Sequence, residues 1–254
     1  MAAVKQSLTQ SLKSNAKFAF VFIVVIWLIK IVEVQFGISF HFLGVYPNEI
    51  RGLTGILTAP LIHGSFEHLA GNSLPLLILL TGLFYGYPNS KYKTILLIWF
   101  LSGLGTWLFA REAWHFGASG LTHGLCFFLL LASILRRDKR SIALMMIAFF
   151  MYGGMLMSIF PREQHISFEY HLFGALAGML AAVLFRNADP KLQEKTYSWE
   201  QQSDDRDNSE DDLIGDEWQL VQTPSELPKE NPAAEDSAIT PGSENDSAIP
   251  IKRE

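Results

Sequence analysis

Residues 116–135 read FGASGLTHGLCFFLLLASIL and contain no Asp, Glu, Lys or Arg. A helix needs about 20 apolar residues to cross the roughly 30 Å hydrocarbon core of a bilayer, and this stretch is long enough. Its apolar residues run continuously instead of alternating, which favours a transmembrane helix over a barrel strand. The stretch therefore predicts a membrane-spanning helix that carries Ser119 near its start.

The charge distribution extends this interpretation to most of the chain, which has 254 residues, 49% of them hydrophobic. Residues 1–185 hold only 20 charged side chains with a net charge of +6, whereas residues 186–254 hold 18 acidic and 7 basic ones. A soluble domain carries about 25% charged residues, so the first part does not fit that class. The overall charge of −5 argues against a nucleic-acid partner, which needs a basic surface.

Six low-charge runs are long enough to be spans, although the last is short: Lys17–Gln35, Leu69–Tyr87, Thr94–Ala110, Phe116–Leu135, Ser141–Pro161 and Tyr170–Phe185. They predict an all-α polytopic membrane protein with a bundle over residues 17–186, after a cytoplasmic segment 1–16. We expect the first run to be retained, because it is longer than a signal peptide's apolar region and no small-x-small site follows it. Its Lys30 and Glu33, three residues apart, can pair or reach the interface.

Residues 187–254 are acidic and rich in Pro, Ser and Asn. Such a segment buries too little apolar area to offset its ordering entropy, so we expect a disordered tail. Its cluster at residues 218–221 is either a motif for an unknown partner or a few apolar residues in a solvated segment. Basic residues gather before the first span and in alternate loops, which predicts that both termini and the tail are cytoplasmic.

Ser119 lies among small residues in the string Gly117-Ala118-Ser119-Gly120. Small neighbours let a second helix come close to the serine hydroxyl. A position near a helix N-terminus also offers backbone N–H groups to a developing oxyanion. The same string is typical of plain helix packing, so it indicates a site only in combination with other motifs.

The last predicted span carries His171, Gly174 and Gly178. The Gly-x-x-x-Gly spacing gives a close-packing face, and His171 lies on the same stripe. If this face meets the helix with Ser119, the imidazole can take the serine proton and activate the hydroxyl. The alternative is a packing histidine bonded to a backbone carbonyl.

A third polar group surrounds the start of the second span and consists of His63, His68 and Asn72. His68 and Asn72 are four residues apart and share one helical face. His63 is about half a turn away from that face, so we expect it in the loop or first turn before the span, with Ser65 near the helix start. Histidine and asparagine side chains can donate hydrogen bonds to an oxyanion.

His123 lies one helical turn after Ser119. It either orients His171 as a neighbouring ring, which we favour, or serves as the base for Ser119, for which an i,i+4 pair has poor freedom. Zinc needs three or four ligands. With one cysteine and no acidic residue deep in a span beyond Glu33, we expect neither a metal nor a cofactor.

These motifs, in this order and on the second, fourth and sixth spans, resemble the rhomboid family of intramembrane serine proteases, over roughly residues 15–186. The resemblance implies a six-transmembrane-helix, rhomboid-like bundle in which Ser119 is the nucleophile and His171 the general base. It implies an oxyanion hole from the Ser119 backbone N–H, His63 and Asn72. The supporting residues would be His68, His123, Gly117, Gly120, Gly174 and Gly178.

Two positions depart from the family's pattern. Many members have a tyrosine where this chain has His123, and an imidazole ring can stack in the same way. The Trp-Arg pair often found in the first external loop is absent, although Arg51 lies in that loop. The second difference bears on scaffold stability or lipid contact rather than on the chemistry.

The implied activity is cleavage of the transmembrane segments of single-span membrane proteins near the outer leaflet of the lipid bilayer. The fifth span, with Gly153-Gly154 at its middle, would be either the family's mobile gate or a plain lipid-facing helix. The alternatives are a catalytically silent relative that binds transmembrane clients, and a transporter, which would have broken helices or an inverted repeat. The compact six-span form favours a bacterial inner membrane.

Overall fold

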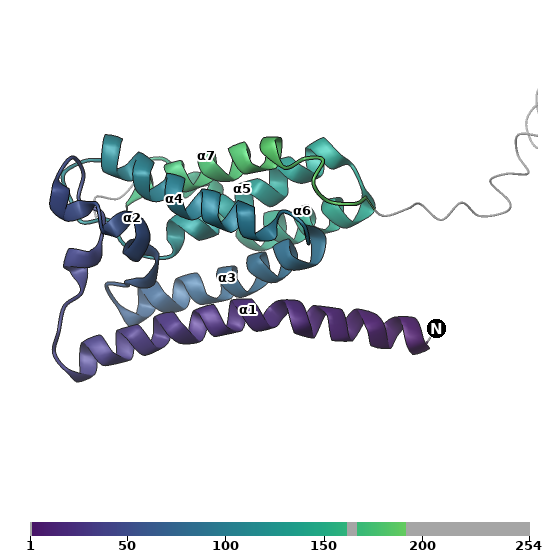
Figure 1. Ribbon diagram of the computed structural model, residues 1–254, viewed down its shortest axis with the longest axis horizontal. Helices are drawn as coiled ribbons and strands as arrows, with labels where there is room; N and C mark the ends of the chain where they lie inside the picture. The colour runs from purple at the N-terminus through teal and green to yellow at the C-terminus, as the bar shows by residue number, and fades with distance from the viewer. Residues whose placement is uncertain (1, 162–166, 192–254) are drawn as a thin grey trace, which may run out of the picture. The chain divides into compact units, whose positions relative to one another are not determined.

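The computed structural model describes residues 2–161 and 167–191, and these are mainly helical (Figure 1). An isolated β-bridge joins Val45 to His115 across two loops. The helices are, in chain order, α1 (Ala2–Gln35), η1 (His41–Leu43), η2 (Ile50–Gly52), α2 (Gly55–Thr58), η3 (Ala59–Leu61), α3 (Phe66–Gly86), α4 (Lys91–Phe109), α5 (Ser119–Arg136), α6 (Lys139–Tyr152), η4 (Gly153–Ile159) and α7 (Phe168–Leu184).

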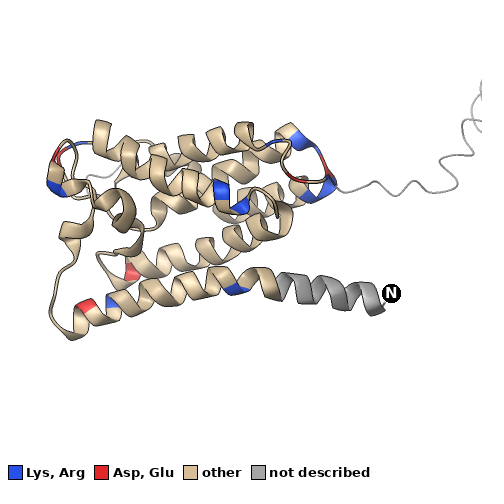
Figure 2. Ribbon diagram, viewed as in Figure 1, with Lys and Arg blue, Asp and Glu red and all other residues tan. Residues whose placement is uncertain are grey.

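Within the described residues, five segments are long and apolar enough to cross a membrane, and α7, with 17 residues, is a shorter apolar helix. Most charged side chains lie toward the ends of the helices (Figure 2). The prediction of an all-α polytopic bundle is therefore confirmed. The five segments are Ser14–Gln35, Phe66–Gly86, Lys91–Phe109, Ser119–Arg136 and Lys139–Ile159.

Several helix boundaries differ from the sequence prediction. The helix α1 already begins at Ala2 instead of near Lys17. The helix α5 begins at Ser119 and not at Phe116, because Gly117 has a φ of +117°, which is not helical, and its N–H donates to the Ala59 carbonyl. As a result Ser119 is the first residue of its helix.

The predicted fifth span is also divided. The helix α6 ends at Tyr152, and the chain continues as the 3₁₀ segment η4 over Gly153–Ile159. The two consecutive glycines have the lowest helix propensity after proline, so the α-helix ends where they begin. The second half of this span therefore has a different backbone from the first.

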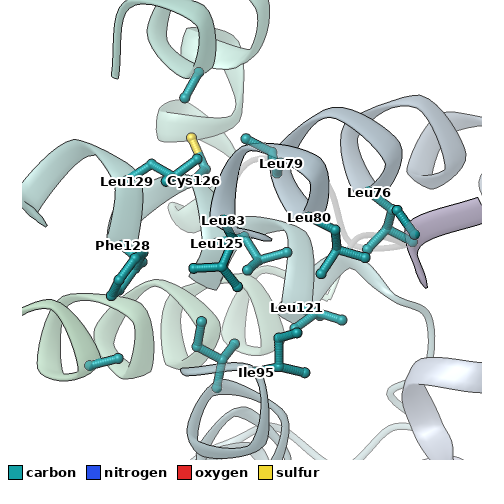
Figure 3. Close-up of a cluster of buried hydrophobic side chains, with 14 of the residues drawn as sticks. Leu76, Leu79, Leu80, Leu83, Ile95, Leu121, Leu125, Cys126, Phe128 and Leu129 are labelled. Atoms are coloured by element: carbon teal, nitrogen blue, oxygen red, sulfur yellow. The ribbon is translucent and has the colours of Figure 1, made fainter. Parts of the chain in front are cut away.

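The helix α5 forms the centre of the bundle. The buried share of its spanning segment is 72%, against 22% for that of α1 and 17% for Lys139–Ile159. Its apolar residues, including Leu125 and Phe128, meet leucines of α3 such as Leu80 and Leu83 (Figure 3). Ser119 therefore lies on the most buried of the five spanning segments in the described part of the chain.

The helix α7 packs on α5 with backbone against backbone, beside α4 (Figure 1). A Cβ atom at Gly174 would lie 2.1 Å from the Gly120 carbonyl oxygen, and one at Gly178 would lie 1.9 Å from that of Gly124. No side chain fits in either place. This close approach brings the first turns of α5 and α7 together.

The chain remains packed on the bundle for a few residues after α7. The Asp189 carboxylate accepts the Asn89 N–H at 2.6 Å, and the Arg136 guanidinium donates to the carbonyls of Asp189 and Pro190 at 3.1 and 3.0 Å. The rest of the predicted tail, from residue 192, and its apolar cluster at 218–221 lie outside the described residues.

Candidate functional site

Ser119 stands at the N-terminus of α5, where backbone N–H groups have no partner inside the helix. The turn that places it there depends on Gly117, whose positive φ suits glycine. A Cβ atom at Gly117 would also lie 2.7 Å from Cε1 of His68. The Gly117 turn therefore lets the start of α5 lie directly against the His68 ring.

His171 lies in the first turn of α7, one turn before Gly174. Its ring stacks on that of His123, with centroids 3.9 Å apart and planes 11° from parallel. The Nδ1 atom of His171 is 3.0 Å from the Ser158 carbonyl oxygen. Because a carbonyl only accepts, Nδ1 carries the proton and Nε2 is left as the basic nitrogen.

His123 is held from both sides of its ring. Its Nδ1 donates to the Ser119 carbonyl at 2.6 Å, and its Nε2 lies 2.7 Å from the Ser158 hydroxyl. The Ser158 hydroxyl has a single proton and also lies 2.8 Å from the Met155 carbonyl, so it contacts both the His123 ring and its own helical turn. The ring is held where it stacks on His171, and the interpretation that it orients His171 stays a prediction.

Ser158 is a site residue that the sequence reasoning missed. It lies on η4 and bonds both histidines, His171 through its carbonyl and His123 through its hydroxyl. The available signal was a serine inside the apolar string Met155–Phe160. A polar group inside a span is expensive, so it calls for a partner elsewhere in the bundle.

His68 and Asn72 lie on the face of α3 that lines a cavity, as their spacing predicts. The helix begins after Ser65, whose hydroxyl accepts the His68 N–H at 3.0 Å. The Asn72 side-chain amide donates to the His68 carbonyl at 3.0 Å. Both side chains therefore line the same cavity as Ser119.

His63 lies elsewhere. It precedes α3, is 1% exposed, and is not among the residues that line the cavity. Its Nε2 accepts the Ala118 N–H at 3.2 Å, and its ring meets that of His68 edge-on. Burial, followed by the neighbouring His68, lowers the pKa of His63 to about 3. A neutral ring whose Nε2 already accepts a backbone N–H is a structural support for the loop before Ser119.

The cavity has a volume of about 830 Å³ and is bounded by α3, the start of α5, η4 and the start of α7. Trp114, Phe116 and Met155 contribute apolar walls. The cavity lining includes five polar side chains that the sequence singled out: Ser119, His171, His123, His68 and Asn72.

Among the described residues no hydrogen bond joins the Ser119 hydroxyl to the His171 ring. Catalytic hydrogen bonds are often long before substrate binds.

No three metal-ligating side chains gather at one place in residues 2–161 and 167–191. The three histidines nearest the serine, His68, His123 and His171, contact backbone groups or one another instead. The arrangement suits proton transfer between a hydroxyl and an imidazole beside a set of N–H donors.

Several uncharacterized mycobacterial proteins are similar to this chain. One from Mycobacterium bovis and one from Mycobacterium tuberculosis H37Rv are each 33% identical over 182 residues, which cover 68% of this chain and 75% of the relative. One from Mycobacterium leprae is 30% identical over 188 residues, covering 68% and 72%. The family model described as the Rhomboid domain matches residues 51–188. Because that match spans more than half of the sequence, the chain belongs to the rhomboid family.

Proposed function

We propose that this multi-pass membrane protein is an intramembrane serine endopeptidase with a Ser119–His171 dyad. The observation that carries the proposal is one cavity lined by both residues, at the N-terminus of α5 and the first turn of α7. The tautomer of His171 supports it, because the Ser158 carbonyl leaves Nε2 free to accept a proton.

In the proposed reaction, His171 Nε2 takes the proton of the Ser119 hydroxyl while the serine oxygen bonds to the peptide carbonyl carbon. Collapse of the tetrahedral intermediate breaks the C–N bond, and the imidazolium gives its proton to the leaving amine. Water, activated by the same imidazole, then hydrolyses the acyl-enzyme. The serine proton leaves with the amine, and a proton taken from the water restores the serine hydroxyl when the acyl-enzyme is hydrolysed.

We assign the oxyanion hole to the Ser119 N–H, the His68 ring and the Asn72 amide, which share the cavity. His68 takes this role instead of His63, because His63 does not line the cavity and its Nε2 already accepts the Ala118 N–H. Donors of this kind stabilise the charge that develops in the transition state.

The proposed substrate is the transmembrane segment of a single-span protein. The cavity lining includes Gly71 and Pro75 of α3. It also includes Tyr152 and Met155, at the point where α6 ends and η4 begins. A helix that changes to 3₁₀ geometry beside the cavity supports the interpretation of the fifth span as the entrance.

The Lys and Arg residues that gather before the first span and in alternate loops support cytoplasmic termini. The bacterial relatives support an inner membrane.

The test is cleavage of a fluorescent transmembrane substrate by purified protein. Ser119→Ala and His171→Ala should each lower the rate at least about 10³-fold, and Ser119 should react with a fluorophosphonate. Ser133→Ala is the matched control: this serine is buried on the same helix, and its hydroxyl donates to the Leu130 carbonyl. It should retain activity.

Unchanged cleavage in Ser119→Ala would remove the protease assignment. A folded wild-type protein that binds the substrate without cleaving it would instead favour the silent, client-binding relative.

A further inference from the structure

The helix α1 carries two charged side chains that are buried inside the bundle. Lys30 is 7% exposed and Glu33 is 5% exposed, and Lys30 Nζ lies 2.9 Å from Glu33 Oε2. An ionisable group at membrane depth is costly, and it persists where it is paired and serves a function. The Rhomboid domain match begins at residue 51, so this pair lies outside it.

Each member of the pair also bonds the backbone of another segment. Lys30 Nζ donates to the Gly64 carbonyl at 3.1 Å, in the loop before α3. Glu33 Oε1 accepts the Phe40 N–H at 2.9 Å, in the loop that follows α1. The pair therefore ties α1 to its own exit loop and to the loop that leads into α3.

Gly64 is the middle residue of a three-residue segment that holds the site. On one side, His63 accepts the Ala118 N–H at 3.2 Å, next to Ser119. On the other side, Ser65 accepts the His68 N–H at 3.0 Å and sets the start of α3. A shift of the Gly64 carbonyl would therefore move the nucleophile loop and the first turn of α3 together.

We propose that Lys30 is a positioning residue for the active site, acting through the Gly64 carbonyl on the oxyanion hole. This inference rests on the proposed protease function. It gives α1 a role in positioning the active site, in addition to anchoring the protein in the membrane. Glu33 neutralises the buried lysine and holds its ammonium group toward Gly64.

A second polar contact between α1 and α3 provides the control. Trp27 Nε1 donates to the Ser73 hydroxyl at 3.0 Å, one turn before Lys30. Ser73 is not among the residues that line the cavity. Loss of this bond weakens the same pair of helices without touching residues 63–65.

The experiment compares the double variant Lys30→Met/Glu33→Gln with Trp27→Phe. The double variant removes the Gly64 contact without leaving one charge buried alone. We expect its kcat to fall about tenfold or more while KM stays within about twofold, because sub-ångström misplacement of catalytic groups reduces rate more than binding. Its rate of fluorophosphonate labelling at Ser119 should fall in parallel. Lys30→Arg, which can still donate to the carbonyl, should recover most of the kcat.

Trp27→Phe should keep the wild-type kcat even if its unfolding temperature drops as far as that of the double variant. A wild-type kcat in the folded double variant, or an equal loss of kcat in Trp27→Phe, would overturn the positioning role. Ser119→Ala in the same assay separates the two proposals: if it still cleaves, the protease assignment fails, whatever the Lys30 variants do.

Discussion

A neutral imidazole at position 63 supports the loop that leads to Ser119. Its Nε2 accepts the Ala118 N–H, and this bond requires an unprotonated nitrogen. His63 lies before α3, outside the spanning segments, and burial holds its pKa at about 3. The free energy of unfolding must therefore depend on pH through this residue.

We expect stability to fall as the pH drops below about 6.5. In that range the unfolded chain protonates His63 while the folded chain does not, down to the folded pKa of about 3. The loss is at most about 1.4 kcal/mol per pH unit. Thermal unfolding in detergent at pH 7 and pH 5 measures this loss of stability.

The control is His63→Gln, which keeps an acceptor for the Ala118 N–H but does not titrate. Its unfolding temperature should therefore depend less on pH. Equal pH dependence in both proteins would contradict the assignment.

At the level of the elements, the site is built by two helix starts that meet. The N-terminus of α5 supplies Ser119, and the first turn of α7 supplies His171, the proposed base. Their approach depends on backbone contact at Gly120–Gly174 and Gly124–Gly178, since any side chain there would separate the helices. The spacing between Ser119 and His171, the two proposed catalytic residues, is therefore a property of this helix pair.

Gly174→Ala tests this interface. Its Cβ would meet the Gly120 carbonyl at 2.1 Å, so we expect a loss of about 1–3 kcal/mol of stability and reduced cleavage. Gly71→Ala on α3 is the matched control, because a Cβ there meets nothing within 4 Å, and its stability should stay the same or rise slightly. Equal unfolding temperatures for the two variants would contradict the close-packing argument.

For the whole molecule, the folded part reaches slightly further than the predicted boundary at residue 186. Asp189 and Pro190 join the end of α7 to the loop that carries Asn89 and to Arg136, the last residue of α5. This group of contacts closes the end of the bundle opposite the start of α5. The composition of the following residues predicts no contribution to the core.

Two truncations should therefore behave differently. A chain ending at Lys191 keeps these contacts and should retain its unfolding temperature and its cleavage rate. A chain ending at Arg186 loses the Asp189 carboxylate, which accepts the Asn89 N–H, and the two carbonyls that accept from Arg136. The buried guanidinium then has fewer partners, which lowers the unfolding temperature. If the longer truncation product were as unstable as the shorter one, residues beyond 191 would belong to the folded unit.

Much of the architecture could be predicted from local pattern. Continuous apolar runs mark the spans, and helical spacing places His68 with Asn72 and His171 with Gly174 on common faces. The exact helix starts could not be predicted in this way. The start of α5 depends on the hydrogen bond from the Gly117 turn to Ala59, a residue far away in sequence.

The sequence by itself determined the membrane class, the order of the helices, and the serine and histidine expected to react, because hydrophobic length and residue spacing are properties of the local chain. Only the tertiary structure decided that His68 and not His63 faces the cavity, that Ser158 bonds both stacked histidines, and that Lys30 reaches Gly64. These contacts join residues on different segments. Their geometry follows from how the helices pack, and no spacing within one segment encodes it.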